Sequence, residues 1–147
     1  MGKAKINILT LAIAYEGVAI PIFWCLLNKA GNATAVEHRA MLVRFIRIIG
    51  NDCITGFLED REFASAKIFA FCNDERIPFY IRIKEGSLVK VKNKKLFKAK
   101  CLFAQLNLSE RLEFQMVVSV YGQTVYLAGS RLNRGELMII ATNQPKP

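Results

Sequence analysis

The sequence predicts an α/β fold, in which helices flank a mixed sheet and a β-rich segment follows. Apolar runs with the composition of strands occur within the first 60 residues. Two segments, residues 34–49 and 64–76, carry apolar residues at helical spacing. From residue 87 onward, apolar and polar residues alternate and no helix is predicted. A chain of 147 residues can bury a sizeable core.

The first predicted element is a β-hairpin. Residues 6–14 and 18–26 are almost continuously apolar, and Gly17 between them can adopt the positive φ of a tight turn. Such runs suit strands that are covered on both faces. Glu16 and Gly17 interrupt the apolar stretch, which argues against a membrane-spanning helix. No cleavage site of a signal peptide follows it, so we expect a cytoplasmic protein without a membrane partner.

The first helix is predicted from its capping residues and its apolar stripe. Thr34 and Glu37 have the spacing of a capping box, and Gly50 marks the end of the helix. Arg44 and Arg47 should point outward. The stripe that faces the sheet consists of Leu42, Phe45, Ile46 and Ile49.

The remaining elements follow from periodicity. A strand is predicted at residues 53–58, and a second helix at 64–76 should bury Ile68, Phe71 and Cys72 before Pro78 ends it. A half-buried strand follows from Phe79, and the β-rich segment should contain runs at 89–92, 112–120, 124–128 and 137–141 with a turn at 121–123.

Three acidic residues lie where the strand at 53–58 meets the second helix. They are Glu59, Asp60 and Glu62. Acidic residues are common before helices because they interact favourably with the helix dipole. Clustered carboxylates at the end of a strand are also ligands for a hard cation such as Mg²⁺. The residues alone leave both explanations open.

A strongly basic segment follows the predicted strand at Phe79. Seven lysines against Glu85 contribute +6 of the formal net charge of +9, namely Lys84, Lys90, Lys92, Lys94, Lys95, Lys98 and Lys100. A polyanion such as DNA is the favoured partner. Lysines on an exposed strand edge that resists aggregation are the alternative.

The cysteines and the single histidine do not have the spacing of a zinc site. Cys25 and Cys53 lie in apolar runs, so we expect reduced, buried thiols. His38 lies on the apolar side of the first predicted helix and should be a packed side chain. No glycine-rich phosphate loop is present, so a nucleotide cofactor has no support.

Several stretches resemble the DDE transposases of bacterial insertion sequences. Asp60, Arg61, Glu62 and Phe63, followed by residues 77–85, resemble the region around the second catalytic aspartate of that family. Residues 5–9 and 15–24 resemble the hairpin after the first catalytic aspartate, and 125–131 resemble a β-rich insertion. The resemblance therefore covers nearly the whole chain.

The resemblance implies a partial ribonuclease H-like core at residues 1–86, followed by a basic, β-rich insertion region at 87–147. Asp60 would be the catalytic residue and a ligand of Mg²⁺ or Mn²⁺ in an enzyme that cleaves transposon ends and transfers them to target DNA. Glu62 would be a partner of that site or a charge at the helix start, and Arg61 would contact a phosphate or neutralise Asp60. The expected DNA-binding residues are Lys90, Lys92, Lys94, Lys95, Lys98 and Lys100.

In that family the first aspartate precedes the hairpin and a glutamate follows the β-rich insertion. Neither has a counterpart here, so we expect a chain truncated at both ends, inactive in isolation and without a stably bound metal. The alternative is a non-enzymatic basic fragment that binds DNA or inhibits intact transposase subunits. We also expect the strand at 53–58 either to border a gap or to pair directly with residues 6–14, and the isolated chain to self-associate.

Overall fold

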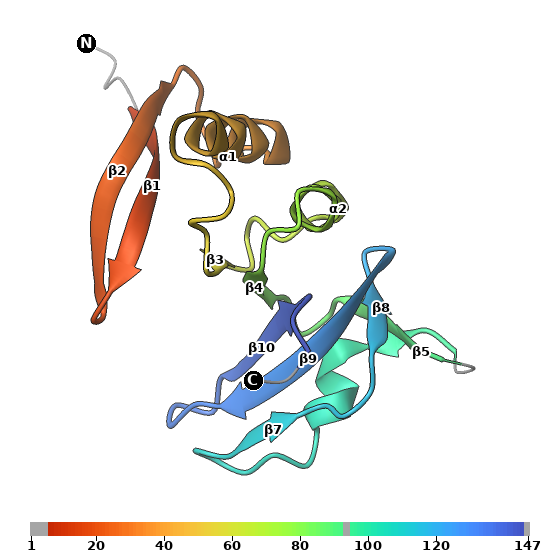
Figure 1. The fold of residues 1–147 in the computed structure, drawn as a ribbon. Coiled ribbons are helices and arrows are strands. Elements are labelled where there is room, and N and C mark those ends of the chain that lie inside the picture. The colour runs from red at the N-terminus through yellow and green to blue at the C-terminus, as the bar shows by residue number, and fades with distance from the viewer. Residues whose placement is uncertain (1–5, 93–94, 146–147) are drawn as a thin grey trace. The chain divides into compact units, whose positions relative to one another are not determined.

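The computed structural model describes residues 6–92 and 95–145 and shows a mixed α/β protein (Figure 1). The chain forms two compact units, residues 1–50 and 51–147. The boundary expected after residue 86 falls inside the second unit, between strands of one sheet. Among the described residues, no helix is long and apolar enough to cross a membrane.

The first unit contains the predicted hairpin. Strands β1 (Asn7–Tyr15) and β2 (Val18–Leu27) pair in antiparallel fashion, and Glu16 and Gly17 form the turn with φ of 48° and 78°. Phe23 faces Phe45 edge-on, with 6.0 Å between the ring centroids. The expected coverage of both faces is wrong, because Ile8, Trp24 and Leu26 are all more than half exposed.

Helix α1 (Ala35–Ile49) follows the prediction closely. The Thr34 N–H and Lys29 Nζ both donate to Glu37 Oε2 at 2.6 Å, and the Glu37 N–H points back to Thr34 Oγ1. Gly50 ends the helix with a φ of 96°. Leu42 and His38 are buried and Arg44 and Arg47 are exposed, as expected, but Ile49 of the predicted stripe is half exposed.

The second unit is built on one sheet that contains both parallel and antiparallel strands. The order is β3-β4-β10-β9-β8-β5-β6, and β7 pairs with β9. Strands β3 (Phe57–Glu59) and β4 (Phe79–Ile83) are parallel and are joined by helix α2 (Ala66–Asp74), with Ser65 as its N-cap. All other neighbouring strands are antiparallel. Parallel neighbours require a crossover connection, which is usually a helix.

The expected strand at residues 53–58 is much shorter than predicted. Asn51 and Ile54 form a turn through the bond from the Ile54 N–H to the Asn51 carbonyl, so only three residues pair with β4. Cys53 lies in this turn and is exposed, so its expected burial is also wrong. Within the described residues, β3 pairs with β4, and β1 pairs with β2. The expected gap or direct pairing between residues 53–58 and 6–14 stays a prediction.

The β-rich part differs from the prediction in two places. The run expected at 112–120 is divided into β7 (Arg111–Glu113) and β8 (Val118–Val120), which pair with opposite halves of β9 (Gln123–Arg131). A 3₁₀ helix, η1 (Ala99–Phe103), occurs where none was predicted. The other strands, β5 (Leu88–Val91), β6 (Phe97–Lys98) and β10 (Leu137–Thr142), complete the sheet.

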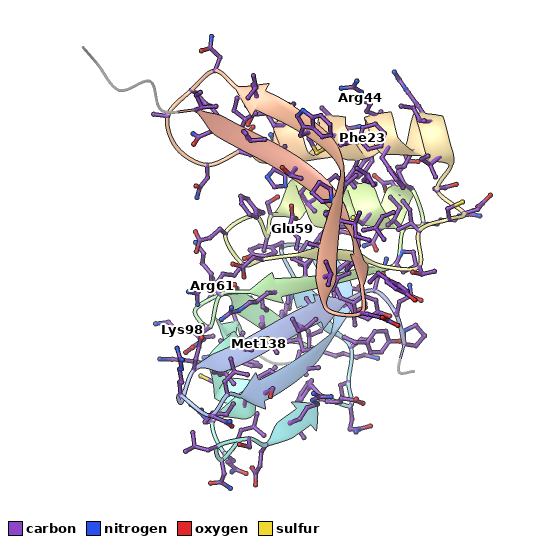
Figure 2. The ribbon with its side chains drawn as sticks, turned by 90° about the vertical axis from the view of Figure 1, so that its left-hand side faces the viewer. Phe23, Arg44, Glu59, Arg61, Lys98 and Met138 are labelled. Atoms are coloured by element: carbon purple, nitrogen blue, oxygen red, sulfur yellow. The ribbon has the colours of Figure 1, made fainter. Side chains whose placement is uncertain are left out.

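The core of the second unit lies on one face of this sheet. The Phe69 ring of α2 packs against the Phe79 ring of β4, with 4.9 Å between the centroids and 46° between the planes, and Phe103 of η1 packs against Gly129 of β9. The opposite face carries the alternate residues of β4, β10 and β9 and is partly exposed; Met138, labelled in Figure 2, belongs to it. Arg82 of β4 lies on this opposite face, together with the charged side chains that it contacts.

Candidate functional site: a charge cluster at the end of β3

Asp60 follows the carboxyl end of β3 directly, as the sequence predicted. The Arg61 N–H donates to Asp60 Oδ1 at 2.8 Å, and the Phe63 N–H donates to the Asp60 carbonyl at 3.1 Å. These bonds close a tight turn ahead of α2 and fix the carboxylate at the strand end. The Asp60 side chain is 56% exposed.

The neighbouring strand places an arginine beside this carboxylate. Because Glu59 pairs with Ile81, the next position along β4 is Arg82, and its Nη1 lies 3.7 Å from Asp60 Oδ1. Arg82 also donates through Nη2 to Glu136 Oε1. Only 20% of its side chain is exposed. Arg82 was not among the predicted site residues, although its position on the polar side of an alternating strand indicated that it points away from the core.

Ion pairs extend the cluster on both sides of Asp60. Arg61 Nη1 lies 3.4 Å from Glu136 Oε1, and Arg61 Nε lies 3.8 Å from Glu62 Oε1. Lys84 Nζ lies 3.7 Å from Glu62 Oε2. The cluster therefore contains three carboxylates, each matched by basic side chains. Glu136 was also missed, because it comes from the turn between β9 and β10, far away in the sequence.

The three acidic residues that the sequence grouped together are separated by the strand geometry. Alternation along β3 turns Glu59 toward α2, whereas Asp60 and Glu62 join the exposed cluster. Burial, assisted by the negative charge of Glu59, raises the pKa of the Cys72 thiol to about 12. Cys72 is therefore an inert thiol at neutral pH.

A divalent metal does not fit the described residues by themselves. No group of three His, Cys, Asp or Glu side chains within residues 6–92 and 95–145 is arranged to hold a metal ion. Asp60 Oδ1 already receives the Arg61 N–H and faces Arg82, and both oxygens of Glu62 face basic groups. Because Mg²⁺ retains its waters when few ligands are offered, a single such carboxylate is a poor site.

The predicted lysines form a second charged surface in this unit. Lys90 pairs with Ser119 and Lys98 with Leu88, so both side chains point away from the buried Val89. Lys92, Lys95 and Lys100 are exposed as well, and Lys94 lies outside the described residues. In the view of Figure 2, Lys98 and Arg61 both lie toward the left of the second unit.

The sheet register connects the lysine surface to the charge cluster. Arg82 pairs with Ile140, which pairs with Ala128 of β9. Four positions earlier on β9, Thr124 pairs with Ser119, which pairs with Lys90. Because residues an even number apart share a face, Arg82 and Lys90 lie on the same face of one continuous sheet.

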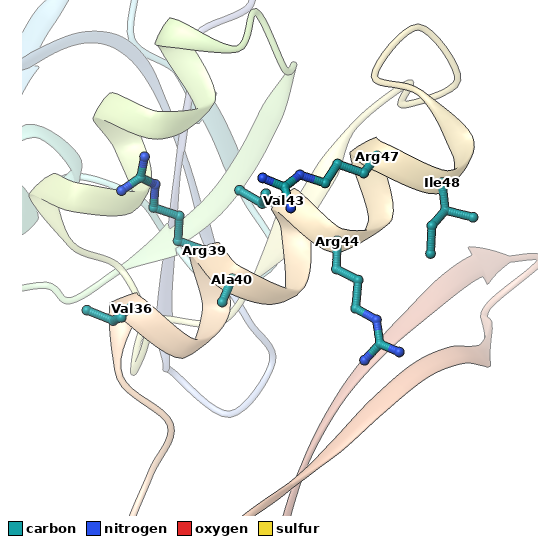
Figure 3. A pocket seen from close by; sticks show the side chains of 7 residues that line it. All are labelled: Val36, Arg39, Ala40, Val43, Arg44, Arg47 and Ile48. Carbon is teal, nitrogen blue, oxygen red and sulfur yellow. The ribbon is translucent and has the colours of Figure 1, made fainter.

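A separate basic surface lies on α1 in the first unit. A hollow along this helix is lined by Val36, Arg39, Ala40, Val43, Arg44, Arg47 and Ile48 (Figure 3). Arg44 extends toward the hairpin, where its guanidinium carbon lies 5.9 Å from the centroid of the Phe23 ring. None of the lining residues is acidic.

Comparison with known proteins adds no identification. No protein-family model matches the chain, and no curated protein or solved structure matches it.

Proposed function

We propose that the chain is part of a DDE transposase that acts on DNA during the transposition of an insertion sequence. The observation that carries the proposal is the position of Asp60, which lies at the carboxyl end of β3 in a β3–α2–β4 unit with a parallel strand pair. Ligands of open α/β sheets bind outside the carboxyl ends of strands. The sequence around Asp60 resembles the second catalytic aspartate of this family.

In this proposal residues 1–86 belong to a ribonuclease H-like catalytic domain, and the β-rich residues 87–147 are its insertion region. Mg²⁺ or Mn²⁺ is the cofactor that the resemblance implies, and Asp60 would be one of the carboxylates that hold it. The protein would work in the cytoplasm, with transposon ends and target DNA as partners. Reading the DNA that flanks the coding region tests the family: an aspartate codon upstream and a Tyr-x-x-Arg-x-x-x-Glu pattern downstream are expected.

DNA binding by the lysine surface is the first biochemical test. Each phosphate contact releases counterions, so the logarithm of affinity should fall linearly with the logarithm of salt concentration, by about 0.9 per contact. The double variant Lys90→Gln, Lys98→Gln should reduce that slope by about 1.8 in fluorescence anisotropy with a labelled duplex. The control Lys67→Gln, Arg76→Gln removes the same charge at exposed positions of and after α2 and should change the slope much less. Equal slopes for the two variants would remove these lysines from the interface.

A second candidate is a non-enzymatic fragment that binds DNA or caps an intact transposase subunit. The ion pair between Arg82 and Asp60 favours it, because Arg82 and the Arg61 N–H both engage Oδ1 of the carboxylate that a metal would need. Under this alternative the purified chain does not nick a labelled transposon end in Mg²⁺ or Mn²⁺. Cleavage that disappears in Asp60→Ala would exclude the alternative and support the enzyme.

A further inference from the structure

Two arginines from separate elements converge on a single carboxylate oxygen. Arg61 comes from the turn after β3 and Arg82 from β4, and both guanidinium groups face Oε1 of Glu136. Paired guanidinium groups are a common means of holding a phosphate, because their planar N–H donors match its oxygens. Glu136 therefore occupies the position that a phosphate oxygen would take between these two arginines.

Glu136 can leave this position without a change in the backbone. Its carbonyl accepts the Leu132 N–H at 2.8 Å, and the Gly135 N–H donates to the Leu132 carbonyl at 2.8 Å. Arg131 Nη1 also donates to the Gly135 carbonyl at 3.1 Å. These bonds hold the β9–β10 turn, so only side-chain rotation is needed. With 42% of the Glu136 side chain exposed, its ion pairs are of the solvent-screened kind that contribute little to stability.

Arg82 retains hydrogen-bonding capacity in the present arrangement. Its Nε is buried and has no hydrogen-bond partner among the described residues. A buried donor without an acceptor is costly, so a ligand that supplies an acceptor to Arg82 is favoured. Arg82 now faces one oxygen of Glu136 and one of Asp60, and neither oxygen accepts from its Nε, whereas a phosphate group offers further acceptor oxygens.

We propose that Arg61, Arg82 and Lys84 form a binding site for a DNA backbone phosphate beside Asp60, and that Glu136 closes this site until DNA displaces it. The inference rests on the proposed function, which supplies DNA as the ligand. The site lies on the same sheet face as Lys90, so one DNA strand can contact the lysine surface and continue to the arginines. Displacing Glu136 would bring a phosphodiester next to the Asp60 carboxylate.

The test is the affinity of the full chain for a labelled duplex at fixed salt concentration. Glu136→Gln removes the internal competitor and should tighten binding about fivefold, because the freed arginines form charge-assisted hydrogen bonds with the phosphate. Glu16→Gln makes the same change of charge in the hairpin turn and should alter the affinity less than about twofold. In the double variant Arg82→Gln, Glu136→Gln, the gain over Arg82→Gln alone should be lost.

A further variant keeps the inference testable without a change of charge. Glu136→Asp retains the negative charge but shortens the side chain, so it should also tighten binding if the contact with the arginines is what closes the site. Circular dichroism and thermal melting check that each variant is folded. If Glu136→Gln is unfolded, Glu136→Asp carries the test, with Arg82→Gln, Glu136→Asp as its double variant.

The outcomes separate this inference from the proposed function. If wild-type protein binds DNA through its lysines but the Glu136 variants bind no better than Glu16→Gln, the inference is overturned and the proposed function is untouched. If the gain persists after Arg82 is replaced, a general charge effect explains it and the inference also fails. Thermal stabilisation of Glu136→Gln by inorganic phosphate, without any gain for DNA, would assign the site to free phosphate and reject DNA as its ligand.

Discussion

At the scale of single residues, Gly129 is required by the packing of the 3₁₀ helix on the sheet. A Cβ atom at this position would lie 2.4 Å from Cδ1 of Phe103, whose side chain is fully buried. Gly129→Ala should therefore lower the free energy of unfolding by about 1–3 kcal/mol, the usual cost of overpacking a core. Urea denaturation measures this change.

Gly86→Ala is the matched control, because a Cβ there meets no atom within 4 Å and the backbone does not have a positive φ. If the two variants lose the same stability, the contact between Gly129 and Phe103 is not the cause.

A residue of the candidate site could be predicted where its signal is local in the sequence. Asp60 was found because an apolar run ends immediately before it, and that signal is local. Arg82 and Glu136 were not found, because their proximity depends on the pairing of β4 with β10 and on the turn after β9. Such pairings are long-range, and alternation within one strand does not reveal them.

At the scale of elements, the start of α1 depends on an ionised Glu37. The hydrogen bond from Lys29 and the backbone N–H of Thr34 are the main causes that lower the pKa of Glu37 from 4.5 to about 2. A carboxyl whose pKa is lowered by folding contributes stability that is fully present above pH 4.5. That contribution is lost as the pH falls toward 2, because the proton then binds more tightly to the unfolded chain.

Glu37→Gln should remove this part of the acid dependence. In a circular dichroism titration between about pH 4.5 and pH 2, we expect the helical signal to fall more steeply in the wild-type protein than in the variant, because α1 loses its capping carboxylate. Glu110→Gln serves as the comparison, because Asn107 also lowers the pKa of Glu110 but lies in the second unit. Superimposable titrations of wild type and Glu37→Gln would show that the capping box does not control the acid response of α1.

The accuracy of the element predictions also has local causes. Helix α1 was predicted well because Thr34 and Glu37 mark its start and Gly50 marks its end, each with a defined backbone partner. The strand at 53–58 was predicted too long, because the apolar residues Cys53 and Ile54 lie in a turn closed by Asn51. Helix η1 was missed, since a 3₁₀ helix of five residues completes fewer than two turns and leaves almost no periodicity in the sequence.

At the scale of the whole molecule, the core and the exposed apolar surface are distributed unevenly. Among the described residues, Met41 and Leu42 are the only buried apolar side chains of the first unit, whereas the second unit holds the large buried aromatic residues. The sequence predicted α/β content and antiparallel β structure, but not this division. Nearly continuous apolar runs in β1 and β2 indicated two covered faces, and composition alone does not show what covers them.

The register of the hairpin explains where its exposed apolar surface lies. Ile8 pairs with Leu26, and Thr10 pairs with Trp24, so these side chains share one face. Leu11 and Phe23 occupy the opposite face, where Phe23 contacts Phe45 of α1. Contiguous exposed apolar patches on soluble proteins mark interaction sites or aggregation liabilities.

In a purified sample, this exposed apolar face can bury itself only against another copy of the same chain. We therefore expect self-association that increases with concentration, measured by sedimentation velocity. Replacing Trp24 and Leu26 by lysine should shift the distribution toward monomer, because each is more than 60% exposed and the lysines would repel their counterparts on another copy. Leu108→Lys, Leu112→Lys introduces the same charge at exposed leucines of the second unit and should leave the association unchanged. A wild-type chain that stays monomeric at all accessible concentrations would show that this face does not bind a second copy.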